Sequence, residues 1–256
     1  MVTAVASYLD AKVAGGIWLV RMEDLDPPRE VPGAADGILR TLEHFGLAWD
    51  GKVRFQSRES DRYRMALDDL LQGGRAFGCN CTRAQLADAS VYPGTCRGRR
   101  MGRAYRLLAG EGSATWEDRA MGPQHFDIAT EVGDFVLRRA DGFWAYHLAV
   151  VVDDADQGVT DIVRGADLLD STARHLILQR ALGVASPTYM HLPLVFNDLG
   201  QKLSKQTLAP SIESWSVRDL YQAVFAHLDL SLEASDSPSD NLARATRAWA
   251  EQLSKT

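Results

Sequence analysis

The chain has 256 residues, of which 46% are hydrophobic and 24% are charged, and its formal net charge is -6. This composition is that of a globular protein with a sizeable core, and the acidic balance argues against indiscriminate nucleic-acid binding while leaving room for a local basic surface. Three cysteines are too few for a disulfide framework, and no segment has the pattern of a signal peptide or a membrane span. We therefore expect a cytoplasmic protein that does not associate with membranes.

Helices and strands alternate along much of the chain. We expect strands at residues 17–22 and 53–57, and helices over residues 2–14 and 37–45 and from residue 60 onward. The alternation resumes with strands at residues 134–139 and 160–165 and a helix over residues 171–182. Strand alternating with helix predicts an α/β fold with a mainly parallel sheet.

Residues 77–130 interrupt this alternation. They show little regular periodicity and contain all three cysteines together with many glycines and arginines, so we interpret them as an insertion. After Pro210 the composition is helical, and after Ser231 it becomes polar and tail-like. The predicted organisation is a first catalytic half at 1–76, an insertion at 77–130, a second catalytic half at 131–212 and a helical C-terminal segment at 213–256.

The three cysteines of the insertion are candidates for a metal site. Cys79 and Cys81 are too close in sequence for an unstrained disulfide, whereas three thiols within 18 residues suit a tetrahedral zinc site that needs one more ligand. Tyr92 is the local candidate for this ligand, because a bound dication can lower the pKa of a phenol. The alternatives are three buried inert thiols or a zinc site open to water.

Charged residues mark the ends of two apolar strands. Glu23 follows the strand IWLVRM, and Arg164 ends the strand TDIVRG. Ligands of open α/β sheets bind outside the carboxyl ends of strands, so the pair could hold the ammonium and a carboxylate of an amino acid. The alternative is a salt bridge at the sheet edge. Tyr146 is a further polar group on an apolar segment.

Two other polar segments have simple interpretations. The segment GQKLSKQ at 200–206 follows the apolar run LPLVFND and is either a solvated turn or a loop that contacts phosphate. Acidic residues near the end of an apolar segment are usually solvated, and we expect this of Asp153, Asp154 and Asp156.

Five segments occur together in the order known from one family: RMEDLDPPR, CNC…YPGTC, FWAYHLAVVVDD, DIVRGADLLDSTARH and GQKLSKQ. Over residues 4–212 the chain resembles the class I glutamyl-tRNA synthetases. It is most similar to their truncated paralogs, the glutamyl-queuosine tRNA(Asp) synthetase family. The resemblance implies a class I aminoacyl-tRNA synthetase Rossmann-like α/β domain with an inserted, zinc-containing subdomain of the acceptor-binding type.

The resemblance also implies a reaction. Members of this family activate L-glutamate with ATP, which we expect to be used with Mg²⁺, and form glutamyl-adenylate and pyrophosphate. They then transfer the glutamate to the queuosine base in the anticodon of tRNA(Asp). A monomer is expected.

Residue roles follow from the family pattern. The resemblance assigns glutamate binding to Glu23, Tyr146 and Arg164. Lys205 matches the catalytic, ATP-contacting lysine of a KMSKS-like loop, where positive charge stabilises the phosphates as adenylate forms. The resemblance assigns one structural Zn²⁺ to Cys79, Cys81, Tyr92 and Cys96.

The start of the sequence departs from the family. The family opens with a strand and a HIGH-type loop that hold glutamate and ATP, whereas this sequence starts within the first helix and none of its six histidines has a HIGH-like context. The expectation is that part of the nucleotide site is missing and that these 256 residues have little or no adenylation activity. A start codon assigned too far downstream would explain the difference.

Two alternative functions remain open. The chain could be the catalytic fragment of a glutamyl-tRNA synthetase that charges a 3′ end, although the segment after Pro210 is short for a helical anticodon-binding domain. It could also be a catalytically impaired, zinc-containing tRNA-binding protein. In that case a basic strip could face RNA, formed by Arg97, Arg99, Arg100, Arg103 and Arg106.

Overall fold

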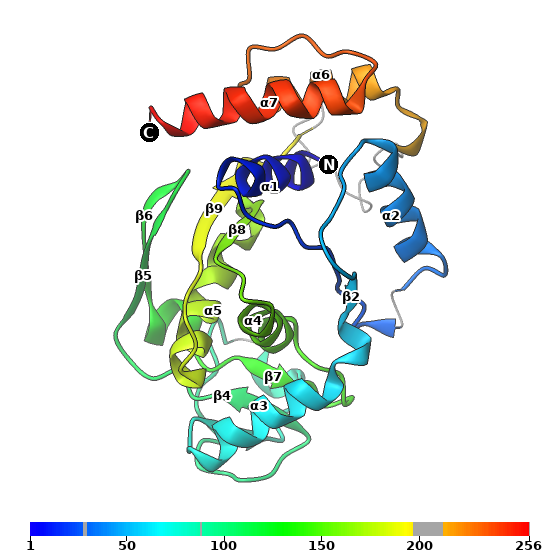
Figure 1. Ribbon diagram of the computed structural model, residues 1–256. Helices are drawn as coiled ribbons and strands as arrows, with labels where there is room; N and C mark the ends of the chain where they lie inside the picture. Colours follow the sequence, from blue (N-terminus) through cyan, green and yellow to red (C-terminus); the bar gives the residue numbers. More distant parts are fainter. Residues whose placement is uncertain (28–29, 88, 197–211, 256) are drawn as a thin grey trace.

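The computed structural model describes residues 1–27, 30–87, 89–196 and 212–255 (Figure 1). Its α-helices are α1 (Val2–Val13), α2 (Ala34–His44), α3 (Ser60–Gln72), α4 (Tyr146–Gln157), α5 (Leu169–Leu182), α6 (Val217–His227) and α7 (Pro238–Leu253). Its strands are β1 (Arg21–Met22), β2 (Arg54–Phe55), β3 (Ala76–Cys79), β4 (Ala104–Leu107), β5 (Ser113–Asp118), β6 (Gly122–Asp127), β7 (Val136–Arg138), β8 (Asp161–Gly165) and β9 (Thr188–Leu192). None of the described helices combines the length and apolar character that crossing a bilayer requires.

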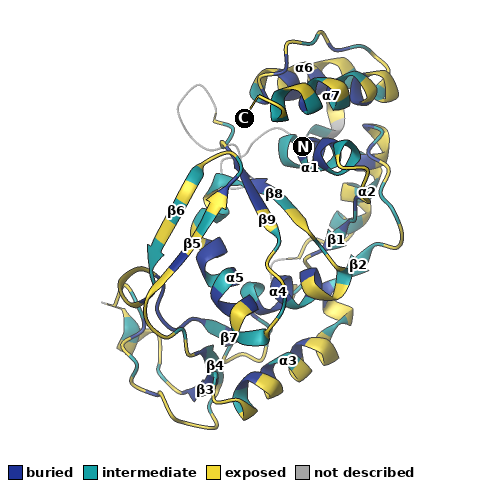
Figure 2. Ribbon diagram, turned by 60° about the vertical axis from the view of Figure 1, so that its left-hand side comes forward, coloured by how far each residue is buried: buried dark blue, intermediate teal, exposed yellow. Residues whose placement is uncertain are grey.

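The largest sheet has the strand order β6-β5-β9-β8. β8 and β9 are parallel and place Arg164 opposite His191, while β5 is parallel to β9 and places Asp118 opposite Tyr189. β9 is buried at four of its five positions, as expected for a parallel strand covered on both faces (Figure 2). The parallel pairs confirm the predicted α/β class, and β6 adds an antiparallel hairpin at one edge.

The first predicted strand is shorter than expected. Only Arg21 and Met22 form a ladder with β2, although the carbonyls of Trp18 and Val20 accept hydrogen bonds from the backbone of Asp50 and Arg54. A turn lies between these two bonds, where Gly51 has a positive φ of 70°. The turn interrupts regular pairing, so the extended backbone of residues 17–20 lies beside its neighbour without forming a strand.

The segment after Ser231 is not a polar tail, as its composition had suggested. It contains α7, which begins with Pro238 after a cap in which the hydroxyl of Ser237 accepts a hydrogen bond from the next turn. The buried face of α7 packs against α1 (Figure 1), and the indole of Trp249 donates a hydrogen bond to Asp10 of α1. The polar composition belongs to the opposite, solvated face of an amphipathic helix.

Residues 77–130 are more regular than their sequence suggested. They include most of β3 and all of β4, which pair with each other and with β7, and the β5–β6 hairpin, which pairs with β9. A second core lies between these strands and α3, α4 and α5, with Tyr63, Leu137, Leu148 and Leu178 at its centre. The hairpin of this segment therefore shares the main sheet, and the proposed domain limits remain a prediction.

Candidate active site

Glu23, Tyr146 and Arg164 line a single cavity of about 540 Å³. They come from three places in the fold: the turn after β1, the first residue of α4 and the end of β8. α1 and the extended residues 16–20 form the opposite wall. The structure thus brings together Glu23 and Arg164, which the sequence had placed at strand ends, and Tyr146, which it had placed on an apolar segment, while the roles of all three stay predictions.

Arg164 is buried, with 7% of its surface exposed, and it has no carboxylate within salt-bridge distance in the described ranges. Its guanidinium binds His191 Nε2 at 3.1 Å, His175 Nδ1 at 3.3 Å and the hydroxyl of Thr172 at 2.7 Å. A buried cation that only neutral groups contact keeps an unbalanced positive charge, which favours an anionic ligand.

Two carboxyl groups line the same cavity. Loss of hydration raises the pKa of Glu23, and burial raises the pKa of Asp154, while Arg21 opposes both shifts. Arg21 Nη2 lies 2.8 Å from Asp154 Oδ1 and 3.9 Å from Glu23 Oε1. The side chain of Asp154 is buried and that of Glu23 is 45% exposed. Carboxylates with raised pKa values gain from a further cation, so the cavity suits a molecule with separate positive and negative charges. The predicted alternative, a salt bridge between Glu23 and Arg164, is not among the ion pairs of the described residues.

The hydroxyl of Tyr146 stays protonated in this setting. Burial, followed by the nearby Glu23 carboxylate, raises the pKa of Tyr146 to about 12. A neutral phenol can donate one hydrogen bond and accept others, so Tyr146 can orient a polar ligand without adding charge to the cavity.

Two acidic residues of α4, Asp153 and Asp154, are not solvated as expected, whereas Asp156 is exposed. Asp153 is fully buried and accepts hydrogen bonds from Gln56 and Tyr63, each at 2.8 Å, while Arg54 lies 3.3 Å away. Asp154 is 5% exposed. They face inward because Arg21 and Arg54, at the start of two neighbouring strands, offer partners that the linear sequence does not reveal. Asp154 is therefore a cavity residue that sequence analysis missed.

A second cavity of about 770 Å³ adjoins the first. Glu23 and Tyr146 line both cavities, and Cys81, Arg106 and Trp144 line the second one alone. The cysteine-containing segment thus forms one wall of a space that is open to the predicted glutamate site.

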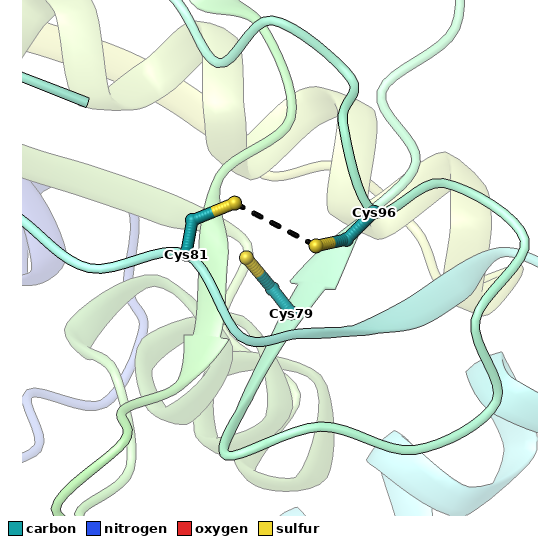
Figure 3. Close-up of side chains that lie close together, drawn as sticks. All are labelled: Cys79, Cys81 and Cys96. Atoms are coloured by element: carbon teal, nitrogen blue, oxygen red, sulfur yellow. Dashed lines mark hydrogen bonds between the residues drawn. The ribbon is translucent and has the colours of Figure 1, made fainter. Parts of the chain in front are cut away.

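The cysteine cluster has the geometry of a metal site. The sulfur atoms of Cys79, Cys81 and Cys96 lie within 4.8 Å of one another (Figure 3), and all three thiols are free. The Cys81–Cys96 separation is 3.6 Å, close to the roughly 3.8 Å that tetrahedral zinc–sulfur bonds of about 2.3 Å require. The Tyr92 hydroxyl lies 3.5 Å from the sulfur atoms of Cys79 and Cys81.

The electrostatics of the cluster favour a thiolate. A hydrogen bond from the backbone of Asn80, then one from the Tyr92 hydroxyl, lowers the pKa of Cys96 to about 6. Zinc binds thiolates in preference to thiols, so the donor set fits this metal.

Two glycines allow the backbone to cross close to Cys79. A Cβ atom on Gly78 would lie 2.1 Å from the carbonyl carbon of Met101, and one on Gly102 would lie 2.2 Å from the backbone nitrogen of Cys79. No side chain fits at either position without moving backbone, so the two glycines fix the strand that presents Cys79.

Three arginines of the predicted basic strip support the cysteine segment itself. Arg97 pairs with Asp134 at 2.7 Å, Arg106 stacks on the ring of Tyr92, and Arg103 donates to the carbonyl of Asn80. Arg99 and Arg100 are exposed. Three of the five arginines therefore stabilise the cysteine segment, in addition to any contact that the strip makes with RNA.

Lys205 and the segment GQKLSKQ lie outside the described residues. The predicted contact between Lys205 and ATP stays a prediction.

The whole chain matches known proteins. The family model for tRNA synthetases class I (E and Q), catalytic domain, matches residues 2–97 and 102–230. A Glutamyl-Q tRNA(Asp) synthetase from Chromobacterium violaceum is 60% identical over 223 residues, covering 83% of this chain and 75% of the relative. One from Burkholderia cenocepacia is 50% identical over 273 aligned residues, covering 99% of this chain and 91% of the relative.

Solved structures agree with the family match. A glutamate tRNA ligase from Elizabethkingia meningosepticum, in complex with its amino acid, superposes with a TM-score of 0.71 at 26% identity. The match covers 80% of this chain and 48% of the ligase, so the chain spans about half the length of that enzyme. The chain belongs to the class I tRNA synthetases (E and Q), a family of aminoacyl-tRNA synthetase ligases, and has their Rossmann-like α/β catalytic domain.

Proposed function

We propose that the chain activates L-glutamate with ATP and transfers it to the queuosine base in the anticodon of tRNA(Asp). One observation carries the first half of this proposal: a buried Arg164, which no carboxylate of the described residues contacts, lines the same cavity as the carboxyls of Glu23 and Asp154. This arrangement complements the carboxylate and ammonium of an amino acid. The printed names of relatives with 60% and 50% identity support the acceptor.

The residues divide the work by charge. Arg164 binds a carboxylate of glutamate, Glu23 binds its ammonium, and Tyr146 donates a hydrogen bond. An oxygen of the glutamate carboxylate attacks the α-phosphorus of ATP and displaces pyrophosphate. A bound Mg²⁺ would supply charge neutralisation of the phosphates. Lys205 stabilises the charge that develops on them. A hydroxyl of the acceptor base then attacks the glutamyl carbonyl and releases AMP.

The cysteine cluster has a structural role in this scheme. Cys79, Cys81, Tyr92 and Cys96 would hold one zinc ion, which would fix the loops of an insertion that has only a small core of its own. The insertion, residues 77–130, then approaches the tRNA between the catalytic halves 1–76 and 131–212. Residues 213–256 close the structure against α1, and the protein acts as a monomer in the cytoplasm.

Replacing Arg164 tests the glutamate site. An Arg164→Lys variant keeps the charge but loses the planar fork, so we expect the affinity for L-glutamate to fall about tenfold or more. Isothermal titration calorimetry measures the change, with Arg218→Lys as control, because Arg218 pairs with Asp236 on the surface. An unchanged affinity in a folded Arg164→Lys protein would exclude Arg164 as the carboxylate contact.

The acceptor is tested by mapping the product. The protein is incubated with ATP, labelled glutamate and tRNA(Asp) with or without queuosine, and the tRNA is then cut with a nuclease. We expect label only with queuosine and only in the anticodon fragment. Label in the 3′ fragment would show a glutamyl-tRNA synthetase instead. Fragment mapping is preferable to periodate treatment, since periodate attacks both the 3′ ribose and the diol of queuosine.

A further inference from the structure

We propose that Asp118 and His191 are positioning residues that hold the guanidinium of Arg164 toward the glutamate cavity by fixing the tautomer of the His191 ring. This inference rests on the proposed role of Arg164. It concerns two buried side chains that do not line the cavity themselves.

Strand pairing brings the three groups together. The parallel register of β8 and β9 places His191 directly opposite Arg164, and the pairing of β5 with β9 places Asp118 next to His191. The three side chains are 7%, 0% and 2% exposed in the order Arg164, His191, Asp118. Asp118 Oδ2 lies 2.5 Å from His191 Nδ1, and Arg164 Nε lies 3.1 Å from His191 Nε2.

The hydrogen bonds leave one arrangement of protons. Arg164 Nε can only donate, so His191 Nε2 must accept and the ring proton must sit on Nδ1. The carboxylate of Asp118 accepts that proton, which stabilises this tautomer over the other. Burial lowers the pKa of His191, so the ring is neutral and its Nε2 lone pair stays available.

The residues around Arg164 orient its guanidinium without neutralising its charge. A carboxylate bound directly to Arg164 would fix it but would also cancel the charge that a ligand needs. Here neutral groups contact the guanidinium: the rings of His191 and His175, the hydroxyl of Thr172, which also contacts His191 Nε2, and the carbonyl of Leu168. The carboxylate of Asp118 contacts His191 and not Arg164 itself. Arg164 is therefore oriented and still cationic.

An Asp118→Asn variant tests this directly because its amide can sit only one way round. Asp118 Oδ1 accepts hydrogen bonds from the backbone N–H groups of Ala120, Met121 and His191. The amide oxygen must take that position, so the NH₂ group faces His191 Nδ1. The ring proton is then driven to Nε2, where it opposes the N–H of Arg164, although the side-chain volume has not changed.

Two measurements follow the consequences. Two-bond ¹H–¹⁵N correlation spectra of the histidine rings are expected to show the Nδ1–H form of His191 in the natural protein and the Nε2–H form in Asp118→Asn. Titration with L-glutamate is expected to show an affinity roughly 10- to 100-fold lower, the usual effect of removing a group that orients a binding residue. The affinity for ATP in the absence of glutamate is expected to stay the same.

Asp134→Asn is the matched control. Asp134 is also buried, at 2% exposure, and accepts hydrogen bonds from Arg97 and from the backbone of Ala109, away from Arg164. Its replacement removes a buried carboxylate of the same kind, and we expect the His191 tautomer and the glutamate affinity to be unaltered.

The outcomes separate this inference from the proposed function. If Asp118→Asn changes the tautomer but not the glutamate affinity, while Arg164→Lys loses affinity, the positioning role is wrong and the glutamate site stands. If neither variant changes the affinity, the glutamate site itself is wrong. An Nε2–H ring in the natural protein overturns the positioning role even if Asp118→Asn does not fold.

Discussion

The hydroxyl of Tyr92 lies 3.5 Å from the sulfur atoms of Cys79 and Cys81, and we propose it as a fourth ligand of the cysteine cluster. We expect the natural protein to bind one zinc ion and the Cys81→Ser variant to bind none. The Tyr92→Phe variant is expected to bind zinc with roughly 10- to 100-fold lower affinity, because water can replace the missing oxygen. Competition with a coloured chelator and metal analysis give the two quantities. The control is Tyr105→Phe, since Tyr105 lies on β4 outside the cluster. Equal zinc affinity in Tyr92→Phe and the natural protein would show that the phenol is not a ligand.

Some residues of the candidate site could be predicted from the sequence, and others could not. Glu23 and Arg164 were predictable because each follows a short apolar strand, and the cysteines because they are close in sequence. Asp118 and His191 gave no such signal. Their contact depends on which strands pair and in which register, and the two residues are 73 positions apart in a sequence that gives no sign of this pairing.

The helix α7 shows how composition misleads at the scale of elements. Its buried residues Leu242, Ala245 and Trp249 recur with helical spacing, yet they are few among polar residues, so the segment looked like a tail. The opposite error occurred at residues 17–22, where a strand was predicted and only Arg21 and Met22 form one. The residues favour a strand, but the neighbouring segment, residues 50–54, makes a turn at Gly51 and does not pair regularly with it. The helices α1, α2, α3 and α5 were all predicted. An apolar face explains this for α2 and α3, whereas α5 buries the polar residues Ser171, Thr172 and His175 and has no strong apolar face of its own.

Replacing Trp249 tests the contribution of α7. Trp249 is 3% exposed, packs in the core with α1 and donates a hydrogen bond to Asp10. Trp249→Ala is expected to lower the free energy of unfolding by about 3–5 kcal/mol, because it leaves a cavity in the core. It also removes one hydrogen bond to Asp10, whose carboxylate keeps its ion pair with Arg119. The exposed Arg247→Ala is expected to change it by less than about 0.5 kcal/mol. Urea unfolding followed by circular dichroism measures both, and similar values for the two variants would mean that α7 does not stabilise the core.

For the whole molecule, buried histidines make stability depend on pH. Burial, followed by the charge of Arg174, lowers the pKa of His147 to about 4, whereas the unfolded chain protonates histidine near about 6.5. The unfolded state therefore binds the proton first as pH falls. The stabilisation is complete above about pH 6.5 and is lost toward pH 4, at about 1.4 kcal/mol per pH unit for this residue.

Urea unfolding between pH 7 and pH 5 checks this sign. His147→Asn retains an acceptor for the ring of His175, which lies 3.2 Å from His147 Nδ1, but cannot titrate. We expect the variant to have a flatter profile than the natural protein, with His125→Asn, an exposed site, leaving the slope as it was. Parallel profiles for His147→Asn and the natural protein would contradict a buried neutral ring.

The contact between Trp249 and Asp10 joins residues 239 positions apart in sequence. At the usual rate of protein synthesis, about 5–20 residues per second, roughly 12–48 seconds pass between the appearance of α1 on the ribosome and that of its partner α7. During this interval the face of α1 that packs against α7 stays uncovered, although β8, which also packs against α1, has already been made. Val5, Ala6 and Leu9, all fully buried in the finished fold, are then available to chaperones, and the core around α1 can close only when the last helix has been made.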